Sequence, residues 1–350
     1  MSKIKIFALG GLNENGKNMY VVDVDENIFV FDAGLKYPIA NMLGVDYIIP
    51  KYEYFIENKK KIKGVFLSHG HDGNMGALVD ILETLPDLPV YATKFTMTVL
   101  KHELEKYNIE ATNLKEIRPH SKLEIAGFSI FPITVTHSIP ETAAFVLYTN
   151  DGAIVYATDF VFDSSMLGAY KTDIGKLAYV GKQGVLCLMA ESSYAYMEGH
   201  TSPKHRIAKD TWNVLNQTEN RVIISVFPEH VYRIQEIFDQ VAKTKRKLVL
   251  MGKKLGDLVK YAEEFNYLKY DKKMIGDLSN INDKDVVILI ADDKENCYAA
   301  LEKIISKYDK YITLKANDTV VISEPVYPGD EKKISKIIDE LSRLDVNTIS

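Results

Sequence analysis

Over the first 200 residues, hydrophobic positions fall in short runs that favour β-strands and are separated by turn residues. Runs of this kind cover residues 3–9, 19–24 and 28–32. Two later pairs of runs predict hairpins, because each pair flanks a turn signal: 145–148 and 153–156 flank Asn150-Asp151-Gly152, and 123–125 and 128–134 flank Ala126-Gly127. Apolar residues at helical spacing predict helices at 75–85 and 95–107. The pattern predicts a layered α/β sandwich in which helices cover sheets.

From about residue 221 the chain changes to a regular alternation of strands and helices. Strands are expected at 222–227, 247–251, 286–290, 319–323 and 346–349, with helices at 233–242, 255–265, 298–308 and 331–344. Repeated strand–helix units imply a parallel, doubly wound sheet. We therefore expect two domains, with residues 1–205 in the first and 206–350 in the second.

Composition narrows the function classes. Of 350 residues, 46% are hydrophobic and 26% are charged, which is typical of a globular protein. The net charge of −5 provides no broad basic field, so any contact with RNA must be local. The amino terminus has too short an apolar run for a signal peptide, and no 18-residue apolar stretch follows, so we expect a cytoplasmic protein with no membrane contact. The loops at 228–230 and 252–256 match no phosphate-binding fingerprint, which argues against a nucleotide cofactor.

The strongest chemical signal is a His-x-His pair directly after an apolar run. His69 and His71 follow residues 64–67, and in an extended backbone side chains at i and i+2 point the same way. Two other predicted strand ends carry His137 and Asp159. Three imidazoles and a carboxylate suit zinc, with manganese or magnesium as alternatives.

Five segments in order along the chain carry a resemblance to the ribonuclease J family: 10–20, 31–38, 136–140, 159–163 and 326–331. The resemblance implies a metallo-β-lactamase αββα sandwich with an inserted β-CASP domain that contains the doubly wound parallel sheet. It also implies a metal-dependent hydrolase of RNA that acts as a 5′ exonuclease and endonuclease.

The family's metal motif reads His-x-His-x-Asp-His, and this chain departs from it. By the resemblance His69, His71 and His137 are metal ligands and Asp159 is the bridging carboxylate. Gly73 and Asn74 stand where the family has Asp and His. The second ion loses two ligands, so we expect one zinc ion and assign no catalytic residue. Asp72 lies one position early and is expected to point away.

The residues expected to bind the RNA substrate also differ from those of the family. The family's phosphate-binding Ser-Asn stretch corresponds to Glu229 and His230, while Arg233 is retained. A carboxylate there opposes a phosphate, although the pair fits a solvated helix amino terminus equally well. Ser192 and Ser193 match a Ser-Thr pair near the phosphate, or form a simple turn. Arg233, Ser192 and Ser193 are the predicted RNA contacts, and the family's Gly-x-Gln-Gly-Glu loop is not recognisable at 291–295.

The resemblance leaves three functions open. Family enzymes return to the first domain and add a carboxy-terminal domain, whereas this chain stops at Ser350, as a fragment or a shortened protein. The altered motif resembles the type 2 paralogue of the family, which accompanies an active paralogue. We expect an RNA decay and processing protein with little activity, bound to RNA and to that paralogue or to a second copy. The alternatives are a non-catalytic structural subunit of the same complex and a one-metal hydrolase of another ester.

Overall fold

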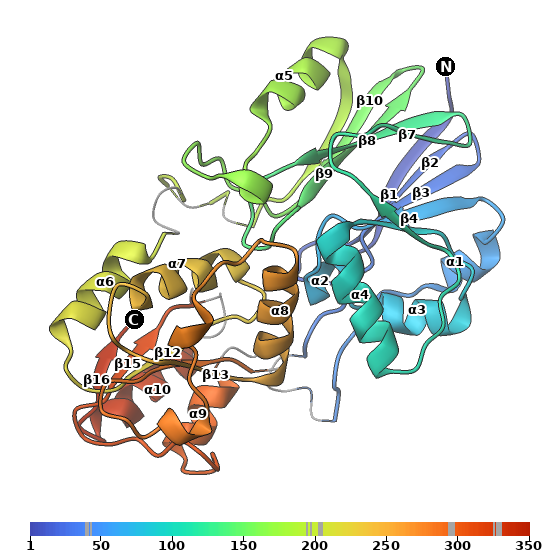
Figure 1. The fold of residues 1–350 in the computed structure, drawn as a ribbon. Coiled ribbons are helices and arrows are strands. Elements are labelled where there is room, and N and C mark those ends of the chain that lie inside the picture. The colour runs from blue at the N-terminus through green and yellow to red at the C-terminus, as the bar shows by residue number, and fades with distance from the viewer. Residues whose placement is uncertain are drawn as a thin grey trace. The chain divides into compact units, whose positions relative to one another are not determined.

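The structure is a computed structural model that describes residues 1–38, 42, 44–193, 195–196, 198–201, 206–292, 298–324, 326 and 331–350. It divides into two units, Met1–Ser202 and Pro203–Ser350, which are described one at a time (Figure 1). In the described part of the chain, no helix combines the length and the apolar character needed to cross a bilayer.

The first unit contains two sheets that face each other (Figure 1). The first sheet has the order β1-β2-β3-β4-β5-β6, formed by Ile4–Gly10, Met19–Val24, Asn27–Phe31, Ile62–Phe66, Val90–Thr93 and Leu114–Ile117. The second has the order β11-β10-β9-β8-β7, formed by Val185–Ala190, Gly152–Ala157, Ala143–Thr149, Phe128–Thr134 and Leu123–Ile125. Both predicted hairpins are therefore confirmed, as β7–β8 and β9–β10.

Aromatic side chains from both sheets form the core between them. Phe31 of β3 stacks on Tyr156 of β10 with ring centroids 5.3 Å apart, and Phe66 of β4 contacts Phe145 of β9 at 5.7 Å. All four side chains are almost fully buried. Burial of such large apolar surfaces is the main force that holds the two sheets together.

Helices cover the outer faces of this pair of sheets (Figure 1). They are α1 Glu53–Asn58, α2 Asp72–Met75, α3 Leu78–Thr84 and α4 Lys94–Lys106 beside the first sheet, and α5 Ile174–Gln183 beside the second, with the 3₁₀-helix η1 at Gly168–Tyr170. Val180 of α5 joins a cluster on the outer face of β8, β9 and β10. The expected αββα sandwich is confirmed.

The single helix expected at 75–85 is wrong, because the chain forms α2 and α3 with a break at Gly76 and Ala77. The Ala77 amide donates to the carbonyl of Ala33, 2.9 Å away and outside the helix. Gly76 lies against Leu35, whose Cγ would be 2.5 Å from a Cβ at that position. The break thus fastens the start of α3 to the loop that follows β3.

The second unit contains one sheet in which all five strands are parallel, in the order β13-β14-β12-β15-β16. Its strands are β12 Val222–Ser225, β13 Leu248–Met251, β14 Val287–Ile290, β15 Thr319–Ile322 and β16 Asn347–Ile349. Its helices are α6 Ala208–Gln217, α7 Val231–Val241, α8 Lys253–Glu264, α9 Ala299–Ile305 and α10 Glu331–Ser342, with η2 Lys272–Met274 and η3 Leu278–Asn280. β12 and β14 are buried along their whole length, as expected for strands covered on both faces. The doubly wound parallel sheet is confirmed.

Candidate metal centre

Two strand ends of the first unit place three histidines in one cluster. His69 and His71 follow β4, and His137 follows β8. The Nε2 atom of His69 lies 2.9 Å from Nδ1 of His71, which lies 3.3 Å from Nε2 of His137. Ligand atoms about 2.0–2.1 Å from a tetrahedral zinc ion are about 3.4 Å apart, so these separations suit one ion. In the described part of the chain, no other set of three potential ligands comes this close together.

Hydrogen bonds on the outer side of the cluster orient the first two rings. The Ser68 hydroxyl donates to Oδ2 of Asp32 at 2.8 Å, so its oxygen accepts a hydrogen bond from Nδ1 of His69 at 2.9 Å. Nε2 of His71 lies 3.3 Å from the Ser138 hydroxyl, which can accept in the same way. The lone pairs of His69 Nε2 and His71 Nδ1 then face each other at 2.9 Å, an arrangement that needs a proton or a cation between them. The residues present therefore fit a metal ion.

Burial keeps these imidazoles in the form that binds metals. Burial and the charges of His71 and His137 hold the pKa of His69 well below its usual value of 6.5. Burial also lowers the pKa of His137, and the carboxylate of Asp159 partly opposes that shift. Both rings are neutral at neutral pH, and neutral imidazole is the species that donates a lone pair to a metal.

One carboxylate lies beside the histidines. Oδ2 of Asp159, which follows β10, is 3.8 Å from Nε2 of His69. Glu191 follows the adjacent strand β11 and interacts with Asp159: desolvation and the charge of Asp159 raise its pKa, while a hydrogen bond from Ser193 lowers it. The sequence analysis did not include Glu191, although the apolar run before it marks a strand end. The contact that the structure gives Ser193 is with Glu191, and RNA binding by Ser192 and Ser193 stays a prediction.

Asn74 is directed at Asp32 and not at the histidines. Its Nδ2 donates to Oδ2 of Asp32 at 2.8 Å and to the Ser68 hydroxyl at 3.4 Å. Gly73 provides no side chain. Asp72 accepts a hydrogen bond from the hydroxyl of Tyr37 at 2.8 Å, in agreement with the expectation that it points away from the metal ligands. At positions 73 and 74 the structure therefore shows no side chain that joins the histidine cluster.

Asp32, at the end of β3, is a buried residue that the sequence analysis did not assign to the site. Besides Asn74 it accepts hydrogen bonds from the Ser68 amide at 2.7 Å, the Ser68 hydroxyl and the Tyr156 hydroxyl at 2.7 Å. Burial raises its pKa to about 7, and these donors lower it in part. Asp32 and Asp159 have φ angles of 61° and 51°, a strained backbone that Asp tolerates and that clusters at functional sites.

In the second unit, the residues at the positions expected to contact phosphate form hydrogen bonds and ion pairs with other residues of the same unit. Glu229 is 4% exposed and pairs with Lys254, so its interpretation as part of a solvated helix terminus is wrong. His230 caps α7, where its Nδ1 accepts a hydrogen bond from the Arg233 amide at 3.4 Å. The buried Arg233 guanidinium donates to the Ser323 carbonyl. Residues 293–295 of the expected loop and 327–330 of the last family segment lie outside the described residues.

Comparisons with known proteins agree with this geometry. The profile of the family "Ribonuclease J, beta-CASP domain" matches residues 219–341, and that of "Beta-lactamase superfamily domain" matches residues 29–175. A crystal structure of a protein of unknown function from Enterococcus faecalis V583 shares the fold, with a TM-score of 0.64 at 15% identity over 99% of this chain and 87% of that chain.

Sequence relatives extend over nearly the whole chain. Ribonuclease J2 of Bacillus subtilis is 35% identical over 350 residues, which are 99% of this chain and 63% of that protein. Ribonuclease J 1 of Streptococcus pyogenes is 30% identical over 353 residues, which are 99% of this chain and 62% of that protein. The chain therefore spans less than two thirds of the length of these relatives. The beta-lactamase superfamily match contains the histidine cluster, and the ribonuclease J beta-CASP match follows it along the chain, so the chain belongs to the ribonuclease J family.

Proposed function

We propose that this chain is an RNA decay and processing protein of the ribonuclease J type, a 5′ exonuclease and endonuclease by descent, with weak or no activity of its own. It acts in the cytoplasm beside an active paralogue and holds one zinc ion. The observation that carries the proposal is the position of Asn74, whose amide binds Asp32 beside three well-placed histidines. The first metal position is supported by its surroundings, and the second has lost its ligands.

The residues of the first unit have distinct tasks in this proposal. His69, His71 and His137 hold the ion, and Ser68 fixes the tautomer of His69. When bound, a zinc ion supplies Lewis-acid activation of water or of a phosphoryl oxygen. Asp159, next to His69, can accept a proton or a hydrogen bond from a substrate hydroxyl, and Glu191 acts on it through its charge. Two-metal phosphodiesterases stabilise both the attacking and the leaving oxygen, and a single ion cannot do both.

Metal content tests this proposal directly. Elemental analysis after dialysis is expected to give one equivalent of transition metal per chain, and His71→Ala is expected to abolish it. His200→Ala is the matched control, because His200 is exposed and lies outside the cluster. Two tightly bound equivalents in the parent would contradict the proposal.

A non-catalytic structural subunit of a ribonuclease J complex is the alternative, favoured by the buried carboxylate of Glu229 at an expected phosphate contact. Crosslinking of labelled RNA to the chain, alone and together with an active ribonuclease J, separates the two. Crosslinks to this chain support the RNA-processing role. Stabilisation of the active protein without any crosslink to this chain supports the structural role.

A further inference from the structure

Acidic side chains follow three neighbouring strands of the second unit. Glu229 comes after β12, Asp292 after β14 and Glu324 after β15, and β14, β12 and β15 are adjacent in the sheet. Glu229 and Glu324 are 4% and 6% exposed. The carboxyl edge of a doubly wound parallel sheet is where such folds bind ligands, and the helix N-termini at this edge favour anions. Carboxylates at this edge are therefore unexpected.

Each of these carboxylates has a partner from its own unit. Glu229 forms an ion pair with Lys254 of α8, and Oδ2 of Asp292 lies 3.6 Å from Nζ of Lys303 of α9. The Ser225 hydroxyl donates to Oε1 of Glu324 at 2.7 Å.

Arg233 is the third cation at this edge. Its guanidinium donates to the Ser323 carbonyl. Burial raises the pKa of Glu324 to about 7, and the nearby Arg233 charge partly opposes that shift, so Glu324 is charged above about pH 7. Arg233 and Lys254 are both largely buried. The two buried cations that an incoming anion would need thus already face internal carboxylates.

We propose that Glu229 and Glu324 are internal counter-ions that close the carboxyl edge of the second sheet to phosphate groups. A phosphate that approached Lys254 or Arg233 would meet the neighbouring carboxylates of Glu229 and Glu324, and like charges repel each other more strongly inside a protein than in water. The two glutamates thereby determine which RNA 5′ ends this unit binds. Arg233 and Lys254 would attract a 5′-phosphate, and the glutamates repel it. Asp292 contributes less, since its partner Lys303 is 63% exposed.

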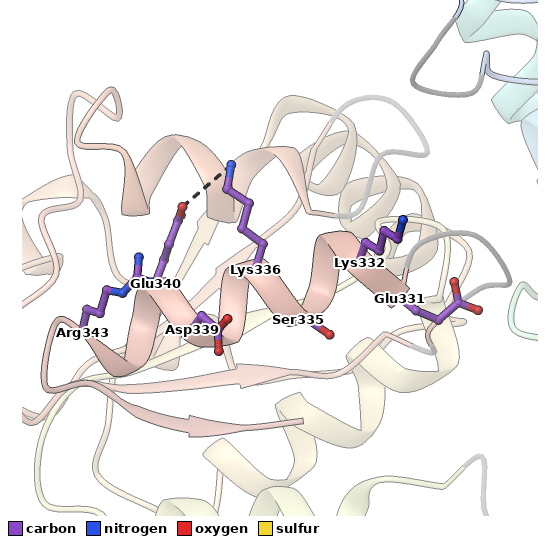
Figure 2. Close-up of a pocket in the computed structure, with 7 residues that line it drawn as sticks. All are labelled: Glu331, Lys332, Ser335, Lys336, Asp339, Glu340 and Arg343. Atoms are coloured by element: carbon purple, nitrogen blue, oxygen red, sulfur yellow. Dashed lines mark ion pairs between the residues drawn. The ribbon is translucent and has the colours of Figure 1, made fainter.

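A charged surface on the same unit provides a contrast. A pocket of about 560 Å³ is lined by residues of α10, which Figure 2 shows as sticks: Glu331, Lys332, Ser335, Lys336, Asp339, Glu340 and Arg343. Nζ of Lys336 and Oε1 of Glu340 are 3.8 Å apart, and the lysine side chain is 73% exposed. Water screens such a pair, so removal of one charge has little effect on the affinity for anions. Glu340→Gln is therefore a control for the loss of one carboxylate in the same unit.

The experiment measures phosphate binding by the full 350-residue chain. The experiment is done at pH 8, where Glu324 is charged, and the probe is inorganic phosphate in place of chloride at constant ionic strength. The readout is the melting temperature, followed by the fluorescence of Trp212, the only tryptophan, which lies in α6. We expect no phosphate-specific rise for the parent or for Glu340→Gln. The double variant that carries both Glu229→Gln and Glu324→Gln is expected to bind phosphate at least about tenfold more tightly than the parent. The same variant is expected to prefer 5′-monophosphorylated over 5′-hydroxyl RNA in binding, and the parent is not.

Two results would overturn the proposal. A parent that melts higher in phosphate, or an equal gain from Glu340→Gln, overturns the proposal. If the double variant does not fold, Glu229→Gln and Glu324→Gln are measured singly, and no gain in either folded variant also overturns it. Phosphate binding requires neither the histidine cluster nor RNA cleavage, so this result is independent of the proposed function.

Discussion

Ser68 connects a buried carboxylate to a metal ligand, and its effect can be isolated at the scale of one residue. Its hydroxyl donates to Asp32 and its oxygen accepts from His69. A partner of this kind fixes the ring orientation and makes the ligand more basic, and its loss typically costs about 10- to 100-fold in metal affinity. Ser68→Ala is therefore expected to weaken zinc binding by that factor, measured by competition with a chelator.

The control for Ser68→Ala is Ser335→Ala, which removes an exposed hydroxyl in the second unit. If Ser68→Ala binds zinc as tightly as the parent does, the rest of the cluster orients His69 without the Ser68 hydrogen bond. A smaller loss in Ser68→Thr is expected, because that substitution keeps the hydroxyl.

Glu324 makes the stability of the second unit depend on pH. Burial raises its pKa from about 4.5 to about 7, against the opposing effects of Ser225, backbone donors and Arg233. Because the unfolded chain releases this proton at lower pH, the stabilisation is complete below about pH 4.5 and is lost as pH rises through 7. A shift of this size corresponds to about 3 kcal/mol.

Glu324→Gln removes this dependence. Relative to the parent, its free energy of unfolding is expected to rise by about 3 kcal/mol between pH 4.5 and pH 8. Urea unfolding followed by Trp212 fluorescence measures it, with Glu340→Gln as the control. A difference between Glu324→Gln and the parent that does not change with pH would show that Glu324 is not the titrating group.

At the scale of elements, periodicity identified most of the fold. Every strand expected in the second unit formed, since each is a run of β-branched and aliphatic residues that the sheet buries. The strands β5 and β6 were missed, because four residues are too few to show a period and the exposed Lys115 and Glu116 interrupt the apolar pattern. The break between α2 and α3 depends on Leu35 and Ala33, which no local pattern reveals.

The edge strand β11 is another element that was missed. Among the described strands it pairs only with β10, and Val185, Leu186 and Leu188 are 41%, 51% and 64% exposed. A continuous apolar run of this kind is typical of a buried central strand, whereas here the run forms the edge strand of its sheet. Unpaired, apolar sheet edges favour association with other chains.

Leu188→Lys is therefore expected to lower self-association of this 350-residue chain, measured by sedimentation velocity over a range of concentrations. Because the leucine is already mostly exposed, the substitution is expected to change the free energy of unfolding by less than about 0.5 kcal/mol. Leu12→Lys is the control, since Leu12 is 66% exposed and lies outside the sheets. Equal self-association of parent and Leu188→Lys would exclude this edge as the contact.

For the whole molecule, the sequence predicted the side chains that meet at the candidate site better than the residues that support them. His69, His71, His137 and Asp159 carry chemical signatures and follow recognisable strands. Asp32, Ser68 and Tyr156 are common residue types, and Tyr156 reaches Asp32 across 124 positions of sequence. Only the folded sandwich shows that they form one hydrogen-bond network. The role of Asn74 in that network was likewise invisible, because the motif alone shows a lost ligand.

This network determines what restoring the family motif can achieve. Gly73→Asp with Asn74→His is expected to raise binding of a second metal ion. A Cβ on Gly73 meets only Gly16 Cα, at 3.3 Å, so the aspartate needs a small adjustment. The histidine has a larger effect, because it removes the Asn74 amide from Asp32. The assay is single-turnover cleavage of 5′-monophosphorylated RNA with manganese or zinc.

The restored pair is not expected to give a fast nuclease by itself, since two separate defects limit the reaction. Loss of the Asn74 hydrogen bond loosens Asp32, and with it Ser68 and His69, while Glu229 and Glu324 still oppose the RNA phosphate. Misplacement of a substrate by about 1 Å can cost about a hundredfold in rate. Adding Glu229→Gln and Glu324→Gln to the restored pair should therefore accelerate cleavage well beyond the pair alone. If both variants cleave at the same rate, access of phosphate to the second unit does not limit the reaction, and the metal ligands alone account for the weak activity that we propose.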